Sequence, residues 1–132
     1  WTLSRGLGDV YKRQIESMHA LREHLEGAYA IAAIDKEDAD NFYLARNKSP
    51  LLLGLGEKEY FAASDPLAIS ELTNEFIFLE DGDTVIVSSA GFEIFDQNQK
   101  TINRDITKLD ISAEASADIS NFVISLFMVF WF

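Results

Sequence analysis

Apolar residues first recur with a regular spacing at Ile15, where the pattern predicts a helix. Ile15, Met18, Leu21 and Leu25 fall near one face, the charged residues lie mostly off it, and Gly27 is the expected C-terminal cap. From residue 28 the chain changes to short apolar runs separated by glycine and charged residues, a pattern typical of strands joined by close turns. Strands that follow a helix in this way indicate an α+β layered sandwich with antiparallel sheets.

The expected strands share apolar, β-branched and aromatic residues. They cover residues 28–34, 42–45, 51–53, 60–63, 75–79, 84–87, 92–95 and 101–102. The first is expected to be a buried strand, and the continuous leucine run of the third predicts a strand that is buried on both faces. An Asp-Gly pair lies within residues 80–83, so we expect a hairpin turn there, with the strand after it pairing with the strand before it.

Polar and glycine-containing segments predict the other turns. We expect a charged hairpin loop at residues 35–40 and a polar turn at 46–50, where Asn47 or Lys48 adopts a left-handed backbone. The segment 54–59 begins Gly-Leu-Gly and continues with three charged residues, which also favours a turn.

A helix-start signal follows at Ser64, Asp65 and Pro66 and predicts a short helix over 66–72. The side-chain oxygen of Ser64 or Asp65 can accept an otherwise unpaired amide, and proline at the first helical position loses no hydrogen bond. Ser64 is therefore interpreted as part of a helix cap rather than as a nucleophile.

Composition limits the classes of partner and of chemistry. The chain has 132 residues, of which 48% are hydrophobic and 25% are charged, and its formal net charge is -11. Such a charge argues against a nucleic-acid partner, because binding to phosphate backbones requires a basic surface. Cysteine is absent from the sequence, which excludes disulfides, thiolate metal sites and a cysteine nucleophile within this chain.

The two ends of the chain differ from the part between them. Residues 4–14 resemble the translation of a transposase sequencing adapter, so we expect residues 1–14 to lie outside the fold; a natural glycine-rich turn is the alternative. Residues 111–132 are interpreted as the start of a linker and an aberrant apolar tail, caused by a frame slip or native to the protein. The apolar stretch from Ile119 is shorter than the ~20 residues of a membrane span, and the start shows no signal peptide, so we expect a cytoplasmic protein without a membrane partner.

Two histidines and three turn acids are the candidate metal ligands and general acids of this chain. His19 and His24 are separated by about 140° around a helix, which does not suit a metal pair, so both are expected to be solvated. Glu80, Asp81 and Asp83 are expected to be water-exposed turn acids, which make poor general acids.

The glycine pair at Gly54-Leu-Gly56 is a candidate phosphate-binding loop. It lacks a third glycine and is followed by acidic Glu57, which would repel a phosphate. Residue patterns therefore predict no catalytic, cofactor-binding or metal-binding residue in this chain.

Four segments in register resemble a known family. They are Leu25-Glu-Gly-Ala-Tyr-Ala and residues 45–56, 60–68 and 76–83, within a match that runs from about Ile15 to Ile106. Together they resemble the later half of the glutaminase domain of the glutamine–fructose-6-phosphate aminotransferases. The resemblance implies a partial N-terminal-nucleophile hydrolase fold, an αββα sandwich, in residues 15–110. It further implies a parent enzyme that releases ammonia from glutamine to make glucosamine 6-phosphate.

The same resemblance implies that this chain lacks the catalyst. In the family an N-terminal cysteine is the nucleophile, an Asn-Gly pair stabilises the oxyanion, and an arginine and an aspartate hold glutamine; all lie upstream of the matched part. The implied partners are the missing N-terminal half of the domain and the downstream sugar-isomerising domains, in a homo-oligomeric parent. We therefore expect this chain alone to be inactive and to need no cofactor.

Two alternatives remain open at this stage. The first alternative to an aminotransferase fragment is a non-catalytic interaction module with a partial fold of this type. The second is a fragment of a related class II amidotransferase, such as amidophosphoribosyltransferase or asparagine synthetase. Coding sequence upstream that begins Met-Cys-Gly would favour an enzyme fragment, whereas a native start near Ile15 would favour the module.

Overall fold

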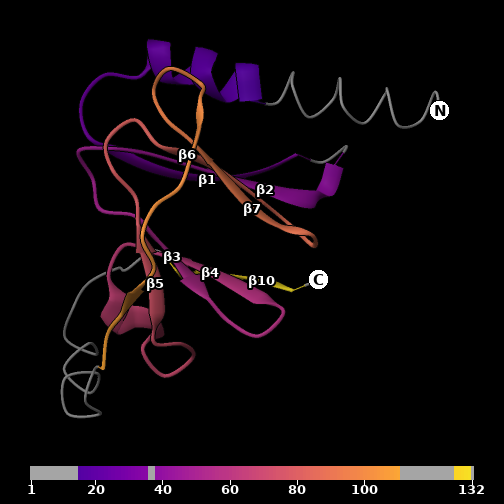
Figure 1. The fold of residues 1–132 in the computed structure, drawn as a ribbon. Coiled ribbons are helices and arrows are strands. Elements are labelled where there is room, and N and C mark those ends of the chain that lie inside the picture. The colour runs from indigo at the N-terminus through magenta and orange to yellow at the C-terminus, as the bar shows by residue number, and fades with distance from the viewer. Residues whose placement is uncertain (1–14, 36–37, 111–126, 132) are drawn as a thin grey trace.

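Two antiparallel β-sheets face each other in the computed structural model, which describes residues 15–35, 38–110 and 127–131 (Figure 1). Residues 15–24 form a helix on the outer side of one sheet, and a short 3-10 helix, η1 (Pro66–Ile69), accompanies the other. The chain is thus a sheet-rich α+β structure, as the sequence predicts. The expectations for residues 1–14 and 111–126 lie outside the described residues.

Each sheet contains five strands. The first sheet has the order β1-β2-β6-β7-β8, formed by β1 (Tyr29–Asp35), β2 (Asp38–Asn47), β6 (Thr84–Ser88), β7 (Gly91–Phe95) and β8 (Thr101–Ile102). The second has the order β10-β4-β3-β5-β9, formed by β3 (Leu52–Leu55), β4 (Glu59–Ala63), β5 (Glu75–Phe78), β9 (Thr107–Lys108) and β10 (Phe127–Trp131).

Apolar side chains form three layers because neighbours along a strand point to opposite faces. The central layer lies between the sheets and contains Leu44, Leu51, Leu53, Ala62, Ile77, Leu79, Val85, Val87 and Ile94. The helix covers an outer layer on the first sheet, made with Tyr43, Ala45, Ile86 and Phe95. The other outer layer, on the second sheet, contains Leu52, Phe61, Ala63, Ile69 and Phe76. The leucine run at 51–53 therefore serves two layers, which confirms that it is buried on both faces.

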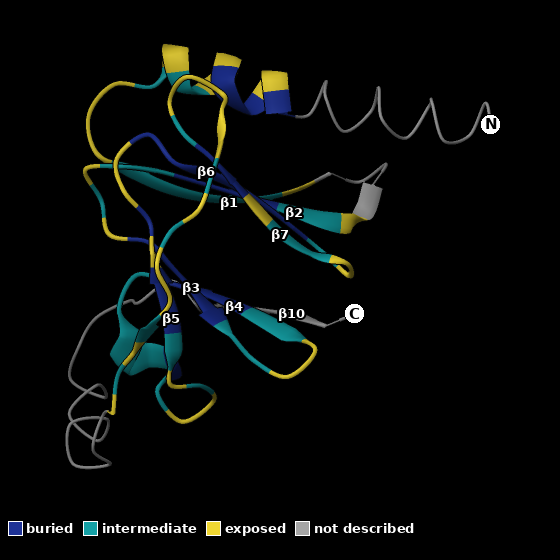
Figure 2. Cartoon of the chain, in the orientation of Figure 1, coloured by how far each residue is buried: buried dark blue, intermediate teal, exposed yellow. Residues whose placement is uncertain are grey.

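The helix places one stripe of residues against the first sheet. Ile15, Met18 and His19 are buried, whereas Leu21 is 41% exposed, so the expectation that Leu21 faces the core is wrong. An advance of six residues from Ile15 turns a helix away from the starting face, while advances of three and four return to it. Figure 2 shows the exposed residues of this helix on the side away from the sheet. The helix ends at His24, three residues before Gly27, so Gly27 is not its immediate C-terminal cap, although its φ of 85° is the left-handed backbone that such a cap would use.

The turn at residues 80–83 differs from the prediction. It does not close a hairpin, because β5 pairs with β3 and β9, whereas β6 pairs with β2 and β7. This turn instead carries the chain from the second sheet to the first (Figure 1). An Asp-Gly pair favours a reversal of the backbone, but that local preference does not choose which strands pair afterwards.

Three further expectations are corrected in detail. β1 is an edge strand with Ile34 54% exposed, so it is not a fully buried strand. The charged loop expected at 35–40 is shorter, because β2 already begins at Asp38. Gly54 lies within β3, and the following turn relies on Lys58, whose φ is 61°.

Other local expectations are confirmed. Lys48 adopts the left-handed backbone with φ of 61°. Asp65 caps η1, since its Oδ1 accepts the Leu67 amide at 2.9 Å, and Pro66 is the first residue of that element.

The element ends at Ile69 rather than at residue 72, so the helix is shorter than expected. Residues 127–131, which the sequence assigns to a tail, pair with β4 as an antiparallel strand.

Candidate functional site

The acidic turn between the sheets is held by two arginines. Arg46, at the end of β2, contacts Asp81 at 2.7 Å and donates to the Leu79 carbonyl oxygen. Arg104 contacts Asp83 Oδ1 at 2.9 Å and Glu80 Oε2 at 2.9 Å. These residues, with their turn, are called the junction below.

Asp83 is the buried centre of the junction. Its side chain is 1% exposed, and Asp83 Oδ2 accepts the Glu80 amide at 2.8 Å and Arg104 Nε at 3.0 Å. The expectation that all three turn acids face water is therefore wrong for Asp83, although Glu80 and Asp81 are exposed. The hydrogen bond to Asp83 raises the pKa of Arg104. Such a bidentate pair fixes a crossing point of the chain, and it occupies the Asp83 carboxylate, which is therefore not free for acid-base chemistry.

His19 and His24 lie in different environments. His24 is exposed as expected, but His19 is 7% exposed, so the expectation of two solvated histidines is wrong. The reason is helical spacing, since His19 follows Ile15 by four residues and returns to the buried face. His19 Nδ1 lies 3.3 Å from an Arg22 nitrogen, and Nε2 has no partner in the described structure. Burial, and then the Arg22 charge, lower the pKa of His19.

Among the described residues, the Arg22 side chain is held by neutral groups. Its Nε donates to the Tyr29 hydroxyl at 3.3 Å, and its Nη1 donates to Thr84 Oγ1 at 3.4 Å. These residues border a polar cavity of about 230 Å³, called the Arg22 hollow below. It lies between the helix, the start of β1, the end of β2 and the turn after β7, and is lined by His19, Arg22, Glu23, Leu25, Tyr29, Asn47, Gln97 and Gln99.

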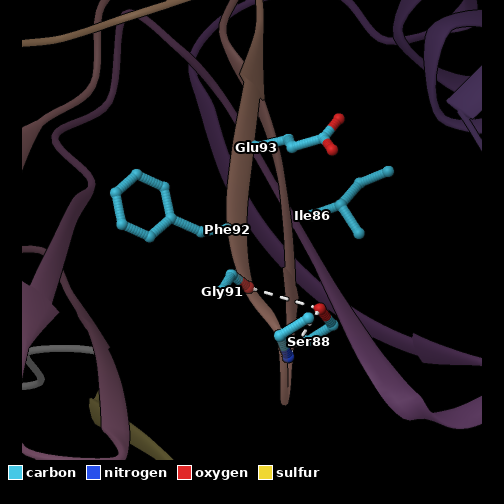
Figure 3. Close-up of a pocket in the computed structure, with 6 residues that line it drawn as sticks. Ile86, Ser88, Gly91, Phe92 and Glu93 are labelled. Carbon is cyan, nitrogen blue, oxygen red and sulfur yellow. Dashed lines mark hydrogen bonds between the residues drawn. The ribbon is translucent and has the colours of Figure 1, made fainter.

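A smaller cavity of about 110 Å³ lies at the β6–β7 hairpin. Figure 3 shows Ile86 and Glu93 on one side of the ribbon and Phe92 on the other. Ser88 is the hydroxyl residue there, and its Oγ accepts the Ala90 amide at 3.3 Å and donates to the Gly91 carbonyl at 3.4 Å. Those bonds stabilise the turn, and the cavity lining contains no histidine or lysine that would activate Ser88.

The glycine pair and Ser64 have structural roles. A Cβ at Gly54 would lie 2.5 Å from Ile69 Cδ1, so glycine allows η1 to pack closely on β3. Ser64 precedes the Asp65 cap, and it is Asp65 that caps η1. Within the described ranges, no three His, Cys, Asp or Glu side chains come together as metal ligands. None of the helices in those ranges has the length and apolar character of a membrane span.

Sequence reasoning missed the two arginine-centred sites. The stripe of Ile15, Met18, His19 and Arg22 at spacings of three and four would have indicated that His19 and Arg22 face the sheet. No comparable signal marks the Asp83–Arg104 pair, because 21 residues separate its members.

Curated relatives of this chain are isomerizing glutamine–fructose-6-phosphate aminotransferases. The chain is 36% identical to that of Fusobacterium nucleatum over 110 residues, which is 83% of this chain and 18% of the relative. It is 48% identical to that of Geobacillus kaustophilus over 80 residues, or 61% of this chain and 13% of the relative. For Shewanella oneidensis the identity is 37% over 101 residues, 76% of this chain and 17% of the relative. No family model matches the chain.

These relatives confirm the resemblance drawn from the four sequence segments. They are much longer than this chain, which spans less than a fifth of the length of each of the three.

Proposed function

We propose, from the premise that this chain is related to the isomerizing glutamine–fructose-6-phosphate aminotransferases, that it forms the later half of a glutamine-hydrolysing domain. The parent enzyme would supply ammonia from glutamine to make glucosamine 6-phosphate. One observation supports this above all: aminotransferase relatives match 61–83% of this chain at 32–48% identity.

The fold we propose is part of an N-terminal-nucleophile αββα sandwich. The order of layers supports it, since the described structure has a helix, two antiparallel sheets and a short helix at the outer face of the second sheet. Residues 15–110 would be the domain fragment and residues 1–14 and 111–132 would not belong to it, although residues 127–131 form strand β10 beside β4. We also propose a cytoplasmic, homo-oligomeric parent with sugar-isomerising domains downstream.

The nucleophile in this proposal comes from another polypeptide segment. The sequence contains no cysteine, so a cysteine thiolate cannot be supplied by these residues. This chain would instead provide the sheet framework on which the catalytic half assembles, and glutamine would be the substrate of the assembled domain.

A reconstitution experiment tests the proposal. The upstream segment of the Geobacillus kaustophilus relative, ending where the similarity to this chain begins, would be produced separately and mixed with this chain. We expect ammonia release from glutamine by the mixture and none by either part alone. A cysteine-to-serine variant of the added segment is the control and should abolish release.

The same experiment distinguishes the alternatives. Glutamine hydrolysis by this chain alone would overturn the assignment of the nucleophile to another segment. Stable association without any hydrolysis would favour a non-catalytic interaction module, for which the open edge of β1 and its exposed Ile34 are the supporting observations.

A further inference from the structure

Arg22 differs from the other described arginines in lacking an acidic partner. Arg46 and Arg104 lie 2.7–2.9 Å from carboxylate oxygens, whereas the side-chain hydrogen bonds of Arg22 within the described structure are long, at 3.3–3.4 Å, and go to neutral groups. Carboxylates are not scarce, because the sequence has 22 acidic residues against 11 basic ones. A half-buried guanidinium without a counter-ion keeps its full capacity to bind an anionic group.

The hollow beside Arg22 is small and polar. Its volume of about 230 Å³ lies below the ~300–1,000 Å³ typical of pockets for drug-sized ligands, which points to a small metabolite. The Tyr29 hydroxyl accepts a hydrogen bond from Arg22, so its own proton remains available to a ligand. Amide side chains from Asn47, Gln97 and Gln99 also line the hollow and suit hydroxyl or amide groups of a ligand.

The negative charges around the hollow select against a simple anion. Glu23 lines the same cavity with an exposed carboxylate and makes no ion pair within the described structure. Asp96 lies near enough, like Glu23, to raise the pKa of His19. A ligand that carries only negative charge would be repelled by both carboxylates. A ligand that also carries an ammonium group would be attracted by Glu23.

We propose that the Arg22 hollow binds a small zwitterionic metabolite, whose anionic group pairs with Arg22 and whose ammonium group faces Glu23. Two kinds of molecule have this chemistry: α-amino acids, with a carboxylate, and amino-sugar phosphates, with a phosphate. The site is separate from glutamine hydrolysis and does not depend on the proposed function, because it is built entirely from residues of this chain.

Binding can be observed through the two histidines of the full 132-residue chain. The test is a titration followed by NMR of the histidine rings, with L-serine in one arm and glucosamine 6-phosphate in the other. We expect saturable shifts of the His19 signals, because an anion on Arg22 offsets the charge next to His19. The signals of exposed His24 serve as an internal control and should not change.

Matched ligands and variants define the two contacts. Glucose 6-phosphate and 3-hydroxypropanoate lack the ammonium group and should bind more weakly than the corresponding zwitterions. Arg22→Gln should weaken zwitterion binding about tenfold or more, as expected for loss of a charged hydrogen-bond partner. Glu23→Gln should remove the preference for the ammonium group, while Glu16→Gln, an exposed change on the same helix, should leave binding unchanged.

Several results would overturn the proposal. These are the absence of saturable His19 shifts with both zwitterions, unchanged affinity in Arg22→Gln, or, in an arm that binds, equal affinity for the zwitterion and for its analogue without the ammonium group. Binding in only one arm would support the site and identify whether its ligand is the amino acid or the sugar phosphate. Because Glu23 is exposed, its variant keeps the test valid even if Arg22→Gln alters the packing.

Discussion

The junction and the Arg22 hollow are two arginine-centred sites with opposite balances of charge. At the junction, Arg104 meets a carboxylate that is 1% exposed, and further bonds from the backbone complete the cluster. In the hollow, the Arg22 side chain bonds to neutral oxygen and nitrogen atoms at longer distances, as far as the described part of the chain extends. The first arrangement stabilises a chain crossing, whereas the second leaves the Arg22 guanidinium able to bind an anionic group.

Removing the buried carboxylate should have the largest effect. Asp83→Ala leaves Arg104 and the Glu80 amide without their partner, and breaking a buried ion pair from one side costs about 3 kcal/mol or more. The free energy of unfolding, measured by urea denaturation, should fall by this amount. Asp81→Ala is the control: its carboxylate is 56% exposed, so a loss under about 1 kcal/mol is expected. Equal losses in both variants would show that burial does not distinguish these acids.

Gly82 connects the two regions, and its replacement should have the next largest effect. Its φ is 90°, and a Cβ there would lie 3.0 Å from Gln97 Cβ and 3.1 Å from Arg22 Nη2. Gly82→Ala should therefore cost about 1–3 kcal/mol and also shift the His19 signals. Gly27→Ala has a similar φ of 85° but no atom within 4 Å, so it isolates the backbone contribution. A smaller loss for Gly82→Ala than for Gly27→Ala would contradict the close contact.

The pH dependence of stability should reveal the buried histidine. Burial and Arg22 lower the pKa of folded His19 below its ordinary value of 6.5, so between these two values the unfolded chain binds more protons than the folded chain. Stability should consequently fall as the pH decreases through 6.5 toward the folded pKa. Unfolding measured at several pH values should show this loss, and His19→Gln should remove it; His24→Gln, at an exposed site, should not.

Replacing Arg22 should have the smallest effect on stability. Its partners are neutral and distant, so Arg22→Gln is expected to change the free energy of unfolding by less than about 1 kcal/mol. Thermal or urea unfolding would measure this change beside Arg104→Gln, which removes the partner of Asp83 and should cost more. If Arg22→Gln proved as damaging as Arg104→Gln, the hollow would be a structural site like the junction.

Much of the local structure could be predicted from apolar patterning. Leucines 51–53, the run at 84–87 and the Asp65-Pro66 signal each match an element of the structure, because alternation and capping depend on neighbouring residues. His19 was misjudged although its spacing from Ile15 carried the needed information. The candidate sites were harder to predict from the sequence, since the Arg22 hollow combines residues from a helix, two strands and a turn.

The sequence by itself determined the α+β class, the positions of most strands and the relationship to the aminotransferases. These properties follow from short-range periodicity and from motifs. They can be predicted without knowing which residues pack against each other across the core. Tertiary structure alone decided that residues 80–83 cross between sheets, that Asp83 is buried beside Arg104, and that Arg22 meets no carboxylate among the described residues. The physical reason is that the pairing of charged side chains depends on the distances between them in space. For residues far apart in the sequence, these distances are fixed only when both sheets have formed.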